Sequence, residues 1–317
     1  MSSARCKQLL DWYGQHARDL PWRETDDPYH IWISEIMLQQ TQVKTVLPRY
    51  ADWFKQFADI KMLAAASLDD VLKAWEGLGY YRRARFIHQA AQRIVADCNG
   101  RFPAVFEDIM ALPGIGRSTA GAISSFCFAA NTPVLDGNVK RVLKRWHGAP
   151  TAADKQLWAL AQQAIDGSGD PSSWNQAMME LGATVCAHKS AACADCPVQA
   201  CCLSAFNVDA AKETRKKVPV LDVHWRIELF TCPKKGIWLT QRAQSGIWGG
   251  LWTPPITELL EPPVAEPTHI HQLTHRRLHL YPYQADSEPD GDGRWVASIE
   301  GYALPSGIHR LLEKVAL

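Results

Sequence analysis

The chain has 317 residues, of which 47% are hydrophobic, and this length and composition predict two or three compact units of a soluble globular protein. No stretch approaches the roughly eighteen uninterrupted apolar residues that a membrane span requires, so we expect no membrane partner. The formal net charge is only +1. Any affinity for nucleic acid must therefore come from local basic clusters. Two clusters stand out, one of Arg82, Arg83 and Arg85 and one of Lys140, Arg141, Lys144 and Arg145.

Residues 1–206 carry the apolar spacing of successive helices, with little sign of strands. Asp27 and Pro28 are expected to open a helix that runs through Gln39, and Ser67 is expected to cap another. A third helix should bury a stripe formed by Ile87, Ala90, Ala91, Ile94 and Val95. The region therefore predicts an all-α domain.

Beyond residue 206 the pattern changes. Residues 207–219 lack apolar periodicity, and we expect an exposed linker at 207–222. From 223 to 317 the apolar period becomes two, as at Trp225, Ile227 and Leu229, which predicts strands. Further strands are expected at 237–241, 278–285 and 293–298, with a Pro-rich loop at 254–267 and a closing helix near 306–316. The sequence thus predicts a multidomain chain in which an α+β domain follows the all-α domain.

Four cysteines, Cys186, Cys193, Cys196 and Cys202, follow the spacing C-x6-C-x2-C-x5-C and must converge on one small object. Thiolates are the standard ligands of a [4Fe–4S] cluster, and so compact a loop leaves no room for the second hairpin of a zinc ribbon. Zinc usually takes two C-x2-C pairs, whereas this loop has one. We therefore expect a [4Fe–4S] cluster, with Cys201 as an alternative fourth ligand on spacing alone.

A disulfide pair is the other alternative for these cysteines, and it requires an oxidising compartment. The N-terminal residues 1–7 contain no apolar signal segment. We therefore expect reduced thiols and a cytoplasmic protein, associated with the nucleoid if the source is bacterial.

Residues 112–121, Leu-Pro-Gly-Ile-Gly-Arg-Ser-Thr-Ala-Gly, join two predicted helices through a tight glycine turn, as in a helix-hairpin-helix. Gly114 and Gly116 would allow backbone N–H groups to point outward at the start of the second helix, where the helix dipole favours an anion. A DNA phosphate is the expected anion, bound without reading of the base sequence. The alternative is an ordinary helix–turn–helix corner.

Two carboxylates are candidates for catalysis. Glu35 has Ile31, Trp32 and Leu38 on its side of a predicted helix, and burial on an apolar face raises a carboxyl pKa as a general acid requires. Asp136 precedes another helix in Leu-Asp-Gly-Asn. The alternatives are that Glu35 only packs at a helix interface and that Asp136 only caps its helix.

Several motifs together resemble the endonuclease III superfamily of base-excision glycosylases and, within it, the MutY-type adenine DNA glycosylases. They are the hairpin, the cysteine loop, Leu-Pro-Trp-Arg (20–23), and residues 34–41, 77–81, 134–141 and 175–182, with looser matches at 246–252 and 271–275. The resemblance implies a helix-hairpin-helix glycosylase domain with an Fe–S loop, followed by a Nudix-like domain that recognises 8-oxoguanine. It also implies a monomer that binds double-stranded DNA and removes adenine mispaired with 8-oxoguanine or guanine.

The resemblance assigns Glu35 to protonating adenine N7 and Asp136 to stabilising the sugar cation. The matching adenine-pocket positions are Trp22, Arg23, Ser118, Asn138 and Glu180, and the matching DNA and lesion positions are Gln40, Tyr80, Gly114, Gly116, Lys140, Thr274 and His275. Leu273 replaces the usual Phe before the last pair. Ser118 stands where bifunctional relatives carry a Schiff-base lysine, so base hydrolysis without efficient strand cleavage is implied, although Lys140 could trap an opened sugar.

Two other functions fit parts of the sequence. An Fe–S protein that binds DNA or transfers electrons would leave the carboxylates incidental, and the apolar face of Glu35 argues against it. An endonuclease III-type glycosylase and lyase for pyrimidine lesions is disfavoured by Ser118 and by the second domain. That domain lacks an R-E-x-x-E-E run, so we expect no pyrophosphatase activity from it.

Overall fold

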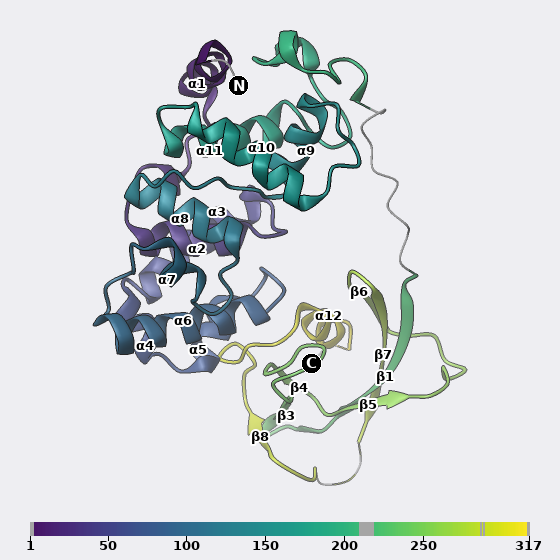
Figure 1. Cartoon of the computed structure of the whole chain (residues 1–317). Helices are drawn as coiled ribbons and strands as arrows, with labels where there is room; N and C mark the ends of the chain where they lie inside the picture. The colour runs from purple at the N-terminus through teal and green to yellow at the C-terminus, as the bar shows by residue number, and fades with distance from the viewer. Residues whose placement is uncertain (1–2, 209–218, 286, 288, 316–317) are drawn as a thin grey trace. The chain divides into compact units, whose positions relative to one another are not determined.

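The computed structural model describes residues 3–208, 219–285, 287 and 289–315, and Figure 1 traces the chain. The chain divides into two compact units. The first comprises Met1–Val46, Asp59–Lys61 and Gln89–Arg215. The second comprises Leu47–Ala58, Met62–His88 and Lys216–Leu317. Most of the predicted linker, residues 209–218, lies outside the described residues. Within the described part of the chain, no helix is long and apolar enough to cross a bilayer.

The N-terminal two thirds of the chain is helical, as predicted. Its α-helices are α1 (Ser3–His16), α2 (Pro28–Leu38), α3 (Val43–Gln56), α4 (Ile60–Ala65), α5 (Leu68–Ala74), α6 (Arg82–Cys98), α7 (Phe106–Met110), α8 (Arg117–Phe128), α9 (Gly137–Trp146), α10 (Asp154–Asp166) and α11 (Pro171–Thr184). Three short 3-10 helices, η1 (Pro21–Arg23), η2 (Cys193–Asp195) and η3 (Gln199–Cys201), complete this region.

Helix α2 begins as its sequence predicts. The Asp27 carboxylate accepts a hydrogen bond from the Tyr29 backbone N–H at 2.8 Å, and Pro28 occupies the first helical position. The helix ends at Leu38, one residue before the predicted end. Seven residues of α2 are buried, so it is an interior helix rather than an amphipathic one.

Helix α11 packs against α8 and α9 around a shared apolar core in the first unit, and α8 also packs against α2. The core includes Leu135, Leu143, Trp146, Trp174, Met178 and Leu181. Helices α9 and α11 approach closely because residue 182 is glycine: a Cβ there would lie 2.7 Å from the Asn138 Cβ. This approach fixes the start of α9 against the last turn of α11.

The predictions for α5 and α6 are largely confirmed. The Ser67 hydroxyl caps α5 by accepting a hydrogen bond from the Asp70 N–H at 3.1 Å. Helix α6 buries Ile87, Ala90, Ala91 and Ile94, while Val95 is only half-buried. Helix α5 belongs wholly to the second unit, whereas α6 is divided between the two units.

The C-terminal region folds as two four-stranded sheets, with strand orders β5-β1-β7-β6 and β2-β3-β4, the latter joined by β8 on β3. The strands are β1 (Leu221–Leu229), β2 (Thr231–Cys232), β3 (Gly236–Gln241), β4 (Trp252–Thr253), β5 (Ile256–Leu259), β6 (His269–Gln272), β7 (Arg276–Gln284) and β8 (Gly293–Val296). Strands β1 and β7 pair in parallel, and helix α12 (Ser306–Lys314) buries Ile308, Leu311 and Leu312 in the same core. The α+β prediction is confirmed.

One local prediction in this region is wrong. The segment 254–267, expected as a loop because of its prolines, contains strand β5, which pairs antiparallel with β1. The prolines flank β5 rather than interrupt it, and β5 is an edge strand, where neighbouring prolines are tolerated.

Candidate active site

Glu35 lies in the middle of the interior helix α2. Burial and, to a lesser extent, the negative charge of Asp136 together raise the pKa of its carboxyl from 4.5 to about 8. A carboxyl with this pKa is mostly protonated at neutral pH. The structure therefore brings the two predicted catalytic carboxylates into electrostatic contact and leaves Glu35 with a transferable proton.

Asp136 is the N-cap of α9. Its Oδ1 accepts a hydrogen bond from the Val139 N–H at 2.7 Å, and its Oδ2 lies 3.4 Å from the Asn138 Nδ2. Burial raises the pKa of Asp136, but these hydrogen bonds and the charge of Arg141 oppose the shift. Glu35 has no comparable opposing influence, so Asp136 ionises before Glu35 does.

Two side chains fix the segment that leads to Asp136. The Ser118 hydroxyl accepts a hydrogen bond from the Leu135 N–H at 3.0 Å, and the Asn175 Oδ1 accepts one from the Val134 N–H at 2.9 Å. The Asn175 Nδ2 donates to the Thr132 carbonyl at 2.9 Å. Helix α8 through Ser118 and helix α11 through Asn175 thereby hold the backbone that precedes Asp136.

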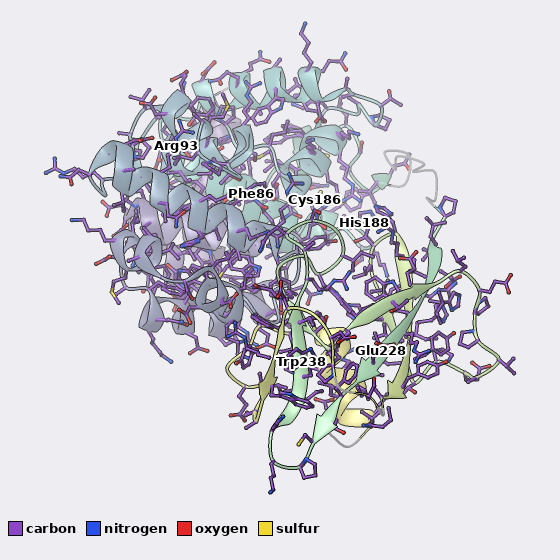
Figure 2. All side chains as sticks on the ribbon, turned by 90° about the horizontal axis from the view of Figure 1, so that it is seen from below. Phe86, Arg93, Cys186, His188, Glu228 and Trp238 are labelled. Carbon is purple, nitrogen blue, oxygen red and sulfur yellow. The ribbon has the colours of Figure 1, made fainter. Side chains whose placement is uncertain are left out.

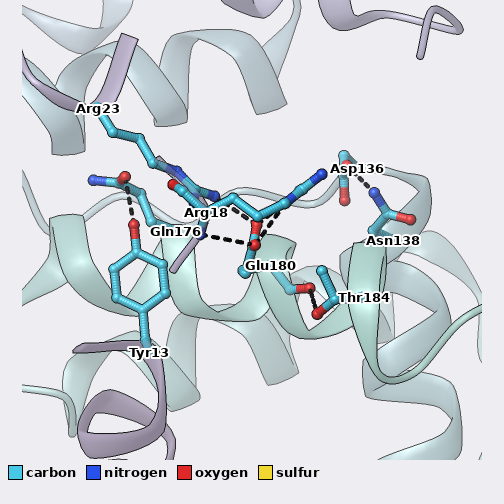
Figure 3. A network of polar contacts seen from close by, with 8 residues as sticks. All are labelled: Tyr13, Arg18, Arg23, Asp136, Asn138, Gln176, Glu180 and Thr184. Atoms are coloured by element: carbon cyan, nitrogen blue, oxygen red, sulfur yellow. Dashed lines mark hydrogen bonds and ion pairs between the residues drawn. The ribbon is translucent and has the colours of Figure 1, made fainter. Parts of the chain in front are cut away.

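Glu180 on α11 is fully buried, between two arginines (Figure 3). The Arg18 Nε and Nη2 donate to its carboxylate at 2.7 and 2.8 Å, and the Arg23 Nη2 donates at 2.7 Å. Burial alone would raise the pKa of Glu180, but the hydrogen bonds and charges of the arginines outweigh burial and lower it. Glu180 is therefore charged, unlike Glu35.

Arg18 was not among the residues that the sequence singled out. It precedes the Leu-Pro-Trp-Arg motif by two residues, and its partner Glu180 lies 162 positions away in the chain. Arg23 completes the network from inside the motif: its guanidinium lies 5.4 Å from the centroid of the Tyr13 ring. The Tyr13 hydroxyl in turn donates to the Gln176 Oε1 at 2.8 Å.

A polar cleft of about 530 Å³ borders this network. It is lined by Trp22, Arg23, Glu24, Thr25, Asp26, Ile31, Phe126, Ser172 and Gln176. Two of the predicted pocket residues, Trp22 and Arg23, therefore face the cleft. Glu35, Asp136 and Glu180 are not part of its lining.

Asn138 connects the catalytic candidate to the cysteine loop. Its Oδ1 accepts a hydrogen bond from the Arg141 Nη2 at 2.8 Å, and its amide nitrogen faces Asp136. Arg141 also donates through Nε to the Cys186 carbonyl at 2.9 Å and through Nη2 to the Gly182 carbonyl at 2.6 Å. A continuous set of hydrogen bonds thus runs from Asp136 to Cys186.

The four predicted cysteine ligands line one small cavity, which Cys201 does not line. The Cys201 thiol instead donates to the Val198 carbonyl at 3.3 Å. The Arg145 Nη1 donates to the Cys186 Sγ at 3.3 Å (Cys186 is labelled in Figure 2). Among the described residues, no three His, Cys, Asp or Glu side chains converge closely enough to hold a single metal ion, as a tetrahedral zinc site would require.

The predicted hairpin joins α7 to α8. Gly114 has φ +77°, the left-handed conformation that glycine adopts without strain, as expected. Gly116 has φ −93° and ψ 171°, an extended conformation open to any residue, so the expectation of a special backbone there is wrong. Gly116 is the N-cap of α8 and supplies no side-chain acceptor to the first N–H groups of the helix.

Most residues of the predicted basic clusters have hydrogen-bond or ion-pair partners within the protein. Lys140 forms an ion pair with Asp154 at 2.6 Å. Arg145 is only 4% exposed and donates to the Ala187 carbonyl at 2.8 Å. Arg83 donates to the Leu78 and Gly79 carbonyls. Net charge counted along the sequence could not reveal these internal partners.

Gln40 and Tyr80, predicted to lie near the lesion, are both exposed and have positive φ values of 57° and 48°. Residues other than glycine avoid this conformation, and its occurrence is frequent at functional sites. In the second unit, the Tyr80 hydroxyl lies 2.6 Å from the Thr274 Oγ1, which connects two residues predicted to serve in lesion recognition.

Thr274 and His275 were expected on a strand, and this expectation is wrong. Both are exposed in the turn between β6 and β7, which the Leu273 N–H closes by donating to the Arg276 carbonyl at 2.8 Å. Leu273, at the position where the resembling family usually has Phe, packs against the apolar core. Alternating apolar residues on both sides of the turn made it look continuous with the strands.

The helical fold, the hairpin and the buried acid define a class of protein, the base-excision glycosylases. Residues 33–166 match the model of the HhH-GPD superfamily of base excision DNA repair proteins, and residues 228–314 match a NUDIX domain model. The solved structure of a thermostable thymine-DNA glycosylase has a TM-score of 0.60 and 28% sequence identity, over 63% of this chain and 94% of its own. The match of residues 228–314 to the NUDIX domain model confirms the prediction that the second domain is Nudix-like.

Curated relatives narrow the class to one family. The chain is 44% identical to the human adenine DNA glycosylase over 63% of this chain and 39% of the human protein. It is 40% identical to the adenine DNA glycosylase of Buchnera aphidicola subsp. Baizongia pistaciae over 77% of this chain and 71% of the relative. The chain belongs to the adenine DNA glycosylase family. Its match spans less than half the length of the human relative.

Proposed function

We propose that the chain is a monofunctional glycosylase that hydrolyses the bond between adenine and deoxyribose when adenine is mispaired with 8-oxoguanine or guanine. The observation that carries the proposal is the pair of Glu35, whose pKa is raised to about 8, and Asp136, which ionises first. Adenine is a poor leaving group, so a carboxyl that is protonated at neutral pH is the required general acid. Family membership supports adenine as the base.

The two carboxylates divide the reaction. A flipped adenine accepts the Glu35 proton at N7, and the electrons of the breaking C1′–N9 bond move into the base. The Asp136 carboxylate stabilises the sugar cation that forms. Glu35, now ionised, takes a proton from water as the water oxygen bonds to C1′. The acid is thereby regenerated, and neutral adenine and an abasic sugar remain.

Double-stranded DNA is the proposed partner. The left-handed Gly114 turn and the absence of a side-chain cap at the start of α8 support binding of a backbone phosphate there. The residue after the hairpin, Ser118, offers a hydroxyl and no amine. Because a Schiff base requires an amine, we propose that strand cleavage does not accompany base removal.

We also propose that Cys186, Cys193, Cys196 and Cys202 hold a [4Fe–4S] cluster. Three observations support this set of ligands. The four cysteines line one cavity, and the Arg145 Nη1 donates a hydrogen bond to the Cys186 sulfur. The Cys201 thiol instead donates to the Val198 carbonyl. Each thiolate of such a cluster binds a different iron, so the sulfurs need not meet at one point. A bound cluster would cross-link the loop and supply one-electron chemistry.

Iron analysis and visible absorbance of the purified protein test the cluster. Cys202→Ser should lose iron and colour, whereas Cys201→Ser should keep both. The reverse result would transfer the fourth ligand to Cys201, and a colourless protein with bound zinc would contradict the cluster.

The function is tested with duplexes that carry adenine opposite 8-oxoguanine, guanine or thymine, together with a thymine glycol duplex. We expect free adenine from the first two only, and strand breaks only after alkali treatment. Excision of thymine glycol with breaks in the absence of alkali would favour the endonuclease III-type function. Binding without release of any base would favour a non-enzymatic Fe–S protein.

A further inference from the structure

We propose that Asp154, at the start of α10, holds the Lys140 amine away from the abasic sugar and so limits covalent trapping of the reaction product by the protein. Asp154 is a positioning residue, because it acts on the sugar only through Lys140. The inference rests on the proposed function, since it takes an abasic sugar beside Asp136 as the product. It gives a role to an ion pair that base hydrolysis itself does not use.

Lys140 is close enough to Asp136 for its amine to reach a sugar bound there. It lies four residues after Asp136, and its backbone N–H donates to the Asp136 carbonyl at 2.9 Å. Residues with this spacing lie on the same face of a helix, with Cβ atoms about 5–6 Å apart. No other lysine in the sequence is as near to Glu35 or Asp136 along the chain. The flexible four-carbon stem of Lys140 therefore makes it the amine best placed to attack the sugar.

An ion pair with α10 holds this amine. The Lys140 Nζ lies 2.6 Å from the Asp154 Oδ2, and helices α9 and α10 pack next to each other (Figure 1). Asp154 is the first residue of α10, where the helix dipole stabilises a negative charge. The Asp136 carboxylate faces the Val139 N–H and the Asn138 amide. The Lys140 amine is thus paired with α10 and not with the carboxylate at the sugar.

Helix α10 also holds a second cation, at the start of α8. Trp158 lies one turn after Asp154, on the same face of α10, and the Arg117 guanidinium lies 4.1 Å from the centroid of its ring. Arg117 directly precedes Ser118, whose hydroxyl fixes the backbone before the catalytic carboxylate. Of the two cations that α10 holds, only Lys140 has an amine that can form a Schiff base. That amine is the one paired with a carboxylate.

The covalent step requires a neutral amine. In the ring-opened abasic sugar, C1′ is an aldehyde carbon, and the lone pair of an amine nitrogen can bond to it. The two hydrogens of the amine then leave with the C1′ oxygen as water, and a C=N bond remains. A lysine ammonium has no lone pair to donate, so Lys140 must give up a proton and leave Asp154 before it can attack.

The exposure of the pair sets the size of the effect. The Lys140 side chain is 35% exposed and the Asp154 side chain 66% exposed. An ion pair this open to water shifts an equilibrium by only a few fold. Asp154 therefore slows the attack of Lys140 on the sugar and does not abolish it.

The test measures covalent trapping separately from base excision. A labelled duplex that already contains an abasic site opposite 8-oxoguanine is mixed with full-length protein in saturating excess, so that differences in DNA affinity do not affect the rate. Sodium borohydride supplies a hydride that reduces the C=N bond to a stable amine. The covalent complex is then followed over time on a denaturing gel.

Asp154→Asn should be trapped roughly two- to fivefold faster than the natural protein, because it removes the ion-pair partner of Lys140. Asp154→Glu should return the rate to the natural value, since it restores a carboxylate. Asp97→Asn is the matched control: it also removes one negative charge and an exposed ion pair, that of Asp97 with Arg93 at 3.2 Å on α6. Its trapping rate should equal that of the natural protein.

Lys140→Arg, added to Asp154→Asn, should remove the gain, because a guanidinium does not form the Schiff base. A gain that survives this change would place the attacking amine elsewhere and overturn the proposal. Equal trapping of the natural protein and Asp154→Asn would overturn it as well, and either result leaves the proposed function intact. Absence of adenine excision by the natural protein would instead contradict the proposed function, and trapping on the preformed abasic site does not depend on it.

Discussion

Glu35 and Glu180 are two glutamates in the same helical unit, each enclosed by protein, and they are in opposite protonation states. Burial of Glu35 on the interior helix α2, together with the negative charge of Asp136, raises its pKa to about 8. Glu180 is fully buried, but Arg18 and Arg23 donate three short hydrogen bonds to it and lower its pKa. Burial favours the protonated form of both carboxyls, and only the arginine partners of Glu180 overcome it.

The largest expected effect comes from removing the proton of Glu35. Glu35→Gln keeps the size of the side chain but cannot transfer a proton, so adenine excision should slow by roughly 10²–10⁴, the usual contribution of general acid catalysis. Single-turnover excision measures the effect, and mismatch binding should persist. Asp11→Asn, an exposed acid on α1, is the control. An unchanged excision rate in Glu35→Gln would exclude Glu35 as the acid.

Removing the charge of Glu180 should mainly affect stability. Glu180→Gln leaves Arg18 and Arg23 with a neutral partner inside the protein, at an expected cost of about 1–3 kcal/mol in the free energy of unfolding. Arg18, whose side chain is 39% exposed, can recover part of this loss from water. Urea unfolding measures it. A stability equal to that of the natural protein would mean that the ion pairs only offset their own desolvation.

The two glutamates should respond to pH in opposite directions. Glu35 has a folded pKa above its unfolded value of 4.5, so its contribution to stability is complete below that value and is lost as pH rises through about 8. Glu180 has a lowered folded pKa, so its contribution is present above the unfolded value and is lost as pH falls through the folded one. The difference in unfolding free energy between the natural protein and each Gln variant, measured with urea across pH, should show the two slopes. Parallel slopes would contradict the comparison.

The pH dependence of the reaction gives a related test. If Glu35 is the acid, the excision rate should decline as pH rises through about 8, because the proton is lost there. A rate that stayed constant well above that pH would place the essential proton on another group.

The smallest effect is expected from a hydrogen bond between two neutral groups. Its contribution to stability should not depend on pH, so it serves as a reference for the two glutamates. Thr274→Val removes the 2.6 Å contact with the Tyr80 hydroxyl and should cost about 0.5–1.5 kcal/mol at every pH. If the turn reads the lesion, the preference for 8-oxoguanine over guanine should also fall, while excision opposite guanine should change little. A preserved preference would remove Thr274 from the lesion-recognition residues.

Local signals in the sequence predicted much of the fold and of the site. Helix caps at Asp27 and Ser67, the spacing of the four cysteines and the apolar face of Glu35 each depend on residues close together in the chain. Asp136 caps α9, as one of its two interpretations predicted, and its charge also acts on Glu35. The structure places these residues where their local context requires.

Contacts between residues far apart in the chain could not be predicted from local sequence patterns. Nothing near Arg18 reveals that Glu180 will meet it, and nothing near Arg145 reveals that it will be buried against the cysteine loop. The strand β5 and the turn at Thr274 were misplaced because proline content and alternation do not show which strand pairs with which. The monomeric state, the linker limits, the cytoplasmic location and the individual residue roles stay predictions.

The division of the chain also has a consequence for the order in which the protein forms during synthesis. The second unit combines Leu47–Ala58 and Met62–His88 with residues that follow the cysteine loop, and its strands β1 and β7 pair in parallel across a long intervening segment. Contacts between segments so distant in sequence form slowly. On the ribosome, the early helices of this unit must wait for nearly the whole chain to emerge before they find their partners. A premature stop in the last strands would remove Leu304, Ile308 and Leu311 from the core of the sheets. The apolar strand surface left exposed should make such a product a target for chaperones and proteases.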